Sequence, residues 1–226
     1  MKIKYNLIPF VIILFSVNAY SQETSIYKIS VGGKIISIPA PIVDFVEVGE
    51  LKRKLIEDQV PKINRLVAFY LPIETNEKYG LEPVVVMKRI LIEVLKANEY
   101  TDFSEKDFID LKNSMKTSLS SGLDDATKEA NSHYAKLKDR YGNRSAGKPI
   151  VLNTILDLKD SYSFLALMNV NTEDGLKNVL TGTLFIRVKN RILYIYVSNI
   201  LEDDESLDWV SNTIKIWNKS IIDLNN

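Results

Sequence analysis

Residues 142–149 (GNRSAGKP) come closest to a recognised chemical motif in this sequence. They spell G-x-x-x-x-G-K, but Pro149 stands where a phosphate-binding loop needs the Ser or Thr that holds magnesium. Such a loop also follows a strand and opens a helix, so that the helix amides meet the phosphates. Here the pattern indicates a helix before the segment and a strand after it. We therefore interpret it as a solvated loop and predict no bound nucleotide.

Metal ligands are equally scarce. His133 is the one histidine, in the polar context KEANSHYAK, and the chain has no cysteine. A zinc site needs several such ligands together, so we expect His133 to be an exposed surface residue. The acids 202–205 (EDDE) are contiguous and lack the glycine and alternating spacing of a calcium loop. They are better explained as the N-terminal cap of a helix, and Asp124-Asp125 as another helix start.

No arrangement of nucleophile and base stands out either. The sequence contains no G-x-S-x-G, and an S-x-x-K match at Ser25 to Lys28 lies at the expected start of the mature chain. Nothing in the sequence brings two carboxylates together, and the 11 tyrosines and 2 tryptophans fall on faces expected to be buried. We favour core packing over ligand stacking for these rings. The sequence thus predicts no catalytic residue, no cofactor-binding residue, no metal ligand and no cofactor.

The first 21 residues have the pattern of a secretory signal peptide. Two lysines precede an apolar stretch from Leu7 to Val17, and the small residues Ala19 and Ser21 predict cleavage before Gln22, with Val17 and Ala19 as the alternative pair. An uncleaved membrane anchor is the other interpretation, but a span needs about twenty apolar residues. We expect a mature chain of residues 22–226 that is secreted or periplasmic.

Composition narrows the choice of partner. Removing residues 1–21 leaves 27 basic and 29 acidic side chains, a net charge of −2. This balance argues against nucleic acid and against a polybasic membrane surface. The lack of cysteine excludes disulfides, thiolate metal sites and cysteine nucleophiles. No second stretch approaches membrane-spanning length. We expect one domain over residues 22–226, without disulfides and monomeric, with an unknown protein or small ligand as its partner.

Hydrophobic periodicity predicts the elements of the N-terminal half. Gly32-Gly33 indicates a hairpin turn, and Ser104 with Asp107 forms an approximate capping box. The expected elements are a hairpin over Ser25–Pro39, a helix over Glu50–Asp58, strands over Arg65–Leu71 and Pro83–Leu95 (the latter with a helix as alternative), a helix from Phe108 to Leu119 that ends at Gly122, and a surface helix over Leu123–Tyr141.

From Pro149 the period changes to two, which predicts antiparallel strands. The expected hairpins are Val151–Leu158 with Tyr162–Val170, and Leu180–Val188 with Arg191–Ser198. Both faces of Ile192–Val197 (ILYIYV) are apolar or aromatic, which predicts a central strand of a sheet covered on both sides. Leu207, Val210, Ile214, Trp217 and Ile221 then follow at helical spacing, which predicts an amphipathic closing helix that begins after Asp203.

This order predicts the α+β class: an antiparallel sheet of six to eight strands flanked by helices on both faces, an α/β/α sandwich. It resembles the PsbP-like fold of extrinsic proteins of the photosynthetic lumen and their bacterial relatives. The likeness is carried by the Gly32-Gly33 hairpin, by Pro61 with NRLVAFYLP, and by ILYIYV leading to the helix with Trp209 and Trp217. The resemblance implies a sheet between helices and assigns no functional site.

For function, the leading hypothesis is an exported, non-enzymatic binding or accessory module of the cell envelope, because no catalytic arrangement is visible. The alternative is a secreted or periplasmic hydrolase with a carboxylate or serine site assembled only by folding. An assembly or stress factor of the envelope is a third possibility. A pocket with two carboxyls of shifted pKa would favour the hydrolase, whereas an exposed apolar patch would favour the binding module.

Overall fold

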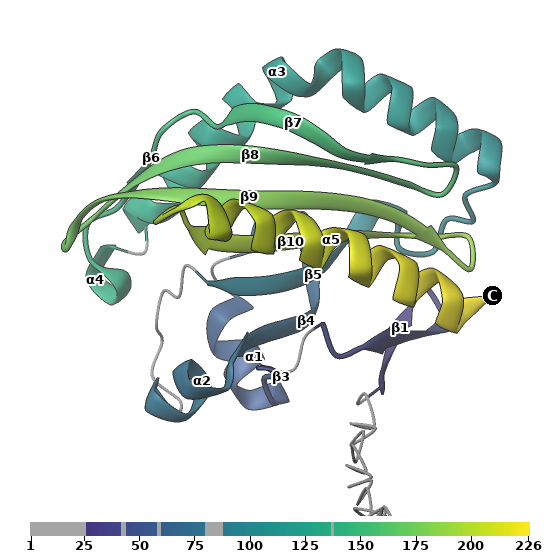
Figure 1. Cartoon of the computed structure of the whole chain (residues 1–226), viewed down its shortest axis with the longest axis horizontal. Helices are drawn as coiled ribbons and strands as arrows, with labels where there is room; N and C mark the ends of the chain where they lie inside the picture. Colours follow the sequence, from purple (N-terminus) through teal and green to yellow (C-terminus); the bar gives the residue numbers. More distant parts are fainter. Residues whose placement is uncertain (1–25, 42–43, 58–59, 80–87, 137) are drawn as a thin grey trace, which may run out of the picture.

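The computed structural model describes residues 26–41, 44–57, 60–79, 88–136 and 138–226 of the chain. It has the predicted α+β fold, built on an antiparallel sheet of eight strands with a separate two-stranded hairpin (Figure 1). The strands are β1 (Ile26–Val31), β2 (Lys34–Pro39), β3 (Phe45–Glu47), β4 (Asn64–Pro72), β5 (Arg89–Leu95), β6 (Ser145–Ala146), β7 (Ile150–Asp157), β8 (Ser161–Thr172), β9 (Gly175–Val188) and β10 (Arg191–Ile200). The helices are α1 (Glu50–Ile56), α2 (Ile73–Tyr79), a 3-10 turn (Lys96–Asn98), α3 (Glu105–Lys136), α4 (Lys138–Tyr141) and α5 (Asp204–Asn225).

The sheet places β10 at its centre, as the apolar and aromatic run 192–197 predicts. Strand order is β3-β4-β5-β10-β9-β8-β6, and β7 also pairs with β8. The pairs β7–β8 and β9–β10 are the two predicted hairpins. Lys189 (φ 49°) and Asn190 (φ 60°) form the second turn in the left-handed region that a two-residue hairpin requires. The order of the strands in the C-terminal half therefore follows directly from the alternation of apolar and polar side chains.

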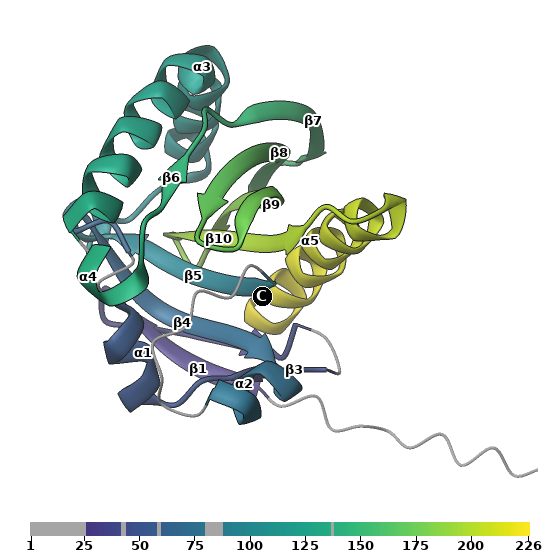
Figure 2. The same cartoon turned by 90° about the vertical axis from the view of Figure 1, so that its left-hand side faces the viewer.

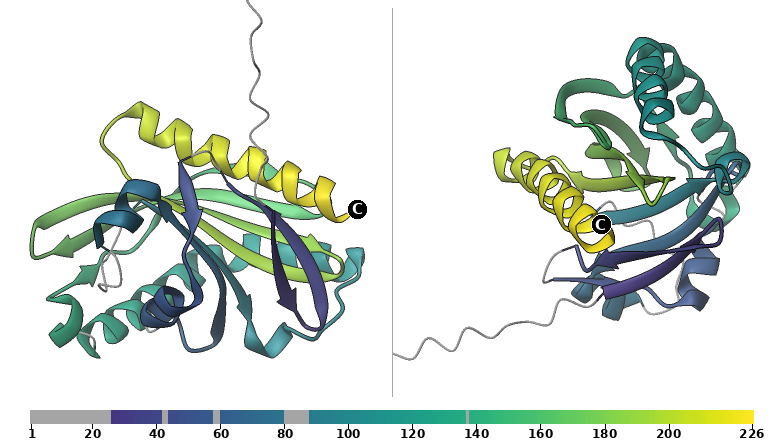
Figure 3. Two further views of the ribbon diagram at one scale, coloured as in Figure 1. Left: turned by 90° about the horizontal axis from the view of Figure 1, so that it is seen from below. Right: turned by 90° about the vertical axis from the view of Figure 1, so that its right-hand side faces the viewer.

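Helices α3 and α5 lie on opposite faces of this sheet (Figure 2). The β1–β2 hairpin lies beside α5, where the Asn225 amide bonds both the backbone N–H and the carbonyl of Ser37 at 2.9 and 2.7 Å (Figure 3). Short α1 covers the outer end of the α3 face, over a separate apolar cluster that includes Leu66, Phe69 and Leu71. Both faces of the sheet are thus covered, as predicted.

The face under α5 is closely packed. Trp217 is 1% exposed, donates its indole N–H to the carbonyl of Pro39 at 2.8 Å and packs edge-on against Tyr70. Helix α5 lies directly on Gly182 in β9, so this position has no room for a side chain. A Cβ there would be 2.8 Å from Cγ1 of Val210 and 3.0 Å from Cγ1 of Ile214. The helix begins as predicted, with Asp203 accepting the N–H of Ser206 at 2.8 Å.

The predicted break between two helices at Gly122 was wrong. Gly122 does not end a helix, because α3 runs unbroken through it from Glu105 to Lys136. Consequently Asp124-Asp125 lie inside α3 and do not start a helix. A glycine inside a helix costs about 1 kcal/mol relative to alanine, whereas starting a new helix carries a nucleation factor of about one in a thousand. Continuing the helix is therefore the cheaper choice.

Other boundaries shifted in smaller ways. Of the predicted strand over residues 83–95, the part from Arg89 to Leu95 is β5, and residues 83–87 lie outside the described residues. The predicted helix over 123–141 divides into the end of α3 and the separate turn α4. The capping box is confirmed, since Ser104 N–H donates to the carboxylate of Asp107 at 2.9 Å. Strands β3 and β6 and helix α2 were not predicted.

Candidate functional site

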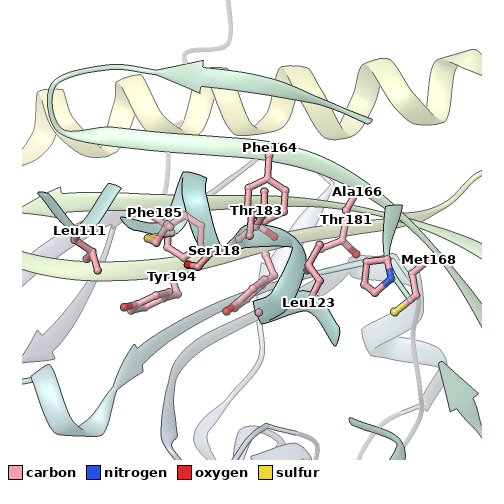
Figure 4. Close-up of a pocket in the computed structure, with 15 residues that line it drawn as sticks. Leu111, Ser118, Leu123, Phe164, Ala166, Met168, Thr181, Thr183, Phe185 and Tyr194 are labelled. Carbon is pink, nitrogen blue, oxygen red and sulfur yellow. The ribbon is translucent and has the colours of Figure 1, made fainter. Parts of the chain in front are cut away.

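A cavity of about 430 Å³ lies between α3 and the sheet (Figure 4). One wall is the middle of α3, and the floor consists of alternate residues of β8, β9 and β10, which point to the same face of the sheet. The lining residues are Leu111, Met115, Ser118, Leu119, Gly122, Leu123, Pro149, Phe164, Ala166, Met168, Thr181, Thr183, Phe185, Tyr194 and Tyr196. Of these fifteen residues none is charged. The cavity is therefore an apolar pocket with a few hydroxyl groups.

Helix α3 spans the pocket because it is attached to the rest of the protein near its two ends. At its N-terminal end Phe108 is 1% exposed and Lys112 donates to the carbonyl of Leu158 at 2.8 Å. Toward its C-terminal end the Asn131 amide bonds both the N–H and the carbonyl of Ala146 in β6, at 2.7 and 2.8 Å. Between these points, no described side chain of α3 is buried. The helix thus bridges the sheet and leaves space beneath its middle.

Hydroxyl groups are the polar part of the lining. Ser118 donates to the carbonyl of Ser114 at 2.7 Å, and the Thr181 hydroxyl is 3.1 Å from that of Ser198. Within the part of the chain that the structure describes, the hydroxyls of Thr183, Tyr194 and Tyr196 form no hydrogen bond. These three groups belong to neighbouring strands and face the same cavity. They are available to a ligand.

The electrostatic surroundings keep the two tyrosines neutral. Burial raises the pKa of Tyr194. Burial also raises the pKa of Tyr196, and the carboxyl of Glu93 on the adjacent strand β5 adds to that shift. Glu93 itself is 3% exposed and accepts a hydrogen bond from Asn64 at 2.6 Å. Burial raises the pKa of Glu93, while Asn64 and the nearby Arg89 lower it by smaller amounts. Both phenols therefore remain hydrogen-bond donors at neutral pH.

The motifs considered from the sequence fall elsewhere. The 142–149 segment follows α4, contributes β6 and leads into β7; its Lys148 pairs with Asp124 at 2.9 Å and holds the loop to α3. The acids 202–205 are exposed at the start of α5. His133 lies in α3, with its side chain outside the described part, and Ser25 is also outside the described residues. The described residues contain no cluster of three or more metal-binding side chains.

Sequence reasoning missed the pocket. It assigned the aromatic residues of ILYIYV to a buried core, and Tyr194 and Tyr196 instead line the cavity. One signal was present: Thr181, Thr183 and Phe185 alternate on β9 as Tyr194 and Tyr196 do on β10, which makes one face of the paired strands partly polar. On the opposite face of these two strands the buried residues of the core are aliphatic, including Leu184, Leu193 and Ile195.

No protein-family model matches this sequence, and no curated protein matches it. Among solved structures, the chain resembles a mutant of the protein Mog1, with a TM-score of 0.33 and 10% identity over 89% of this chain and 93% of that one. It also resembles the Saccharomyces cerevisiae Ran-binding protein Mog1p, with a TM-score of 0.30 and 11% identity over 89% and 90%. Similarity at this level assigns neither a ligand nor a partner to this chain. It also leaves the PsbP-like resemblance as a prediction.

These matches correct the predicted function. The sequence was interpreted as an exported accessory module of the cell envelope, with an exported hydrolase as the alternative, whereas the matched structures are Mog1 proteins, one of them described as Ran-binding. The envelope interpretation conflicts with these matches and is not carried further, whereas secretion of the mature chain stays a prediction. It depended on residues 1–21, which lie outside the described residues, and on missing catalytic motifs, which carry no information about compartment. In the described residues, no helix has the length and apolar character needed to cross a membrane.

Proposed function

We propose that this protein binds an apolar small molecule in the pocket between α3 and the sheet. The observation that carries the proposal is the cavity of about 430 Å³ with an uncharged, mostly apolar lining. Its volume lies in the range of about 300–1,000 Å³ that is typical of small-molecule sites. It could hold about 14 water molecules at liquid density, yet its lining offers those waters few hydrogen bonds. Replacing them with an apolar ligand is favourable.

The position of the pocket supports the same function. It lies above the longest strands of the sheet. Hydrogen bonds hold the covering helix near both ends, whereas the described side chains along its middle are not buried. Phe164 and Phe185 supply aromatic surface on the floor, and Met115 supplies a flexible side chain on the helix. A sheet on one side and a helix with a flexible methionine on the other suit a ligand that is bound mainly by apolar contacts.

Binding of N-phenyl-1-naphthylamine, an uncharged apolar fluorophore, tests this function with the full chain. We expect saturable fluorescence enhancement at one site per chain. Ala166→Leu adds three carbon atoms to the buried floor of the pocket and should weaken binding at least tenfold. The matched control is Ala135→Leu, the same change at an exposed position of α3 outside the lining, which should bind as the wild type does. Absence of saturable binding, or equal binding by both variants, would contradict the proposal.

A further inference from the structure

The hydroxyl groups in the pocket indicate what kind of apolar molecule it accepts. Tyr194 and Tyr196 are two residues apart on β10 and point to the same face, so both side chains line the cavity. Neither hydroxyl has a hydrogen-bond partner among the described residues. A phenol that a ligand covers without supplying an acceptor loses its bond to water and is left unpaired, which weakens binding. A ligand with an oxygen acceptor at this point avoids that loss.

Charge in and around the pocket argues against an anionic head group. None of the lining residues is a cation, and the buried carboxyl of Glu93 lies near Tyr196. Cations near the site in the fold already face acids: Arg89 interacts with Glu93, and both Lys112 and Lys116 pair with Asp157. A carboxylate placed between the tyrosines would lose its hydration without gaining a free counter-charge.

We propose that the ligand is an uncharged amphipathic molecule whose carbonyl-type oxygen accepts hydrogen bonds from the hydroxyls of Tyr194 and Tyr196, while its hydrocarbon part lies against Phe164, Phe185 and Met115. The inference rests on the proposed function and deepens it by naming the ligand class. Esters and ketones of medium chain length have this chemistry. Free fatty acids, which are ionised at neutral pH, do not.

A pair of probes that differ only in the head group tests the inference. Methyl decanoate and decanoate are used at pH 8 to displace N-phenyl-1-naphthylamine from the full-length protein. We expect methyl decanoate to displace the fluorophore at a concentration at least tenfold lower than decanoate. Displacement by decanoate at an equal or lower concentration would overturn the inference while leaving the apolar pocket in place.

Variants test whether the preference for the ester over the carboxylate comes from Tyr194 and Tyr196. The double variant Tyr194→Phe/Tyr196→Phe removes only two oxygen atoms. Relative to fluorophore binding measured on the same variant, it should weaken the binding of methyl decanoate by about two- to tenfold per lost hydrogen bond. Tyr162→Phe is the matched control, because Tyr162 is buried on the same face of β8 but does not line the pocket. Unchanged ester binding in the double variant would also overturn the inference. If the wild type fails to bind the fluorophore, the proposed function itself fails, and this inference with it.

Discussion

The two faces of the sheet are covered by helices that differ in how closely they pack against it. Helix α5 buries seven residues along its 22-residue length, and Gly182 beneath it leaves no room for a side chain. Helix α3 is ten residues longer, yet of its described side chains only those of Phe108 and Lys112 are buried. The α5 face supplies stability through apolar contact. The α3 face keeps a cavity beside a small apolar cluster of Tyr162, Phe164 and Ala166, and polar contacts attach the helix near its ends.

Truncating one large side chain on each face should show the largest difference between the two faces. Trp217→Ala should lower the free energy of unfolding by about 3–5 kcal/mol, because it empties a fully enclosed site and removes the bond to Pro39. Met115→Ala on α3 should cost about 1 kcal/mol or less, since this half-buried side chain already borders a cavity. Urea denaturation of both variants measures the difference. Equal losses would mean that the two faces are packed alike.

A second prediction concerns the attachment of α3. Asn131→Ala removes both hydrogen bonds to the buried Ala146 backbone and should cost about 1–3 kcal/mol, since those groups are then left unpaired. Amide hydrogen exchange should become faster in the C-terminal half of α3 and stay unchanged in α5. Asn113→Ala, at an exposed position of the same helix, is the control. Faster exchange in α5 as well would show that the two helices are coupled through the sheet.

The α5 face also contains an imperfection that can be removed. The Tyr70 hydroxyl is fully buried beside Trp217 and has no hydrogen-bond partner among the described residues. Tyr70→Phe should therefore raise the free energy of unfolding by about 1 kcal/mol, because an unpaired buried hydroxyl is unfavourable. Exposed Tyr100→Phe should leave stability unchanged in the same urea experiment. A loss of stability in Tyr70→Phe would reveal a partner for this hydroxyl outside the described residues.

How far the fold could be predicted depends on how local the cause of each element is. Alternation within β9 and β10 and the spacing from Leu207 to Ile221 are local patterns, and all three elements formed as predicted. Gly122 failed as a helix end because the sequence does not show that Asn131, nine residues further on, attaches the same helix to β6. The pocket could not be predicted because it is a space left between α3 and the strands β8, β9 and β10, which are distant from α3 in the sequence. No pattern within one segment encodes such a gap.

Glycines show the same limit. Gly32 was correctly assigned to a hairpin turn from its Gly-Gly context, and its φ of +52° agrees. Its second role depends on distant residues, since a Cβ at this position would collide with the carbonyl oxygen of Glu99. Gly182 lies inside the predicted strand Leu180–Val188, and a lone glycine inside a strand often marks close approach of another element. That signal could have placed α5 over β9 from the sequence.

The smallest predicted effect is a pH dependence of stability that arises from Glu93 on the pocket face of the sheet. On β5 the residues that face α5 include Ile92 and Val94, whereas Glu93 between them is buried on the pocket face. Because burial raises the pKa of Glu93, the folded protein holds its proton to higher pH than the unfolded chain does. Stability that this group contributes is present at low pH and is lost as the pH rises above the ordinary carboxyl range. Opposing effects of Asn64 and Arg89 keep the change small.

Glu93→Gln removes this titration while keeping the oxygen that accepts from Asn64. Between pH 4.5 and 8 the stability of the variant should therefore fall less steeply than that of the wild type, as measured by urea denaturation at several pH values. Exposed Glu129→Gln should retain the wild-type slope. A steeper fall in Glu93→Gln would mean that the attraction of Arg89 outweighs burial, and that Glu93 stays ionised beside the pocket. In that case the negative charge next to Tyr196 would exclude an anionic ligand even more strongly.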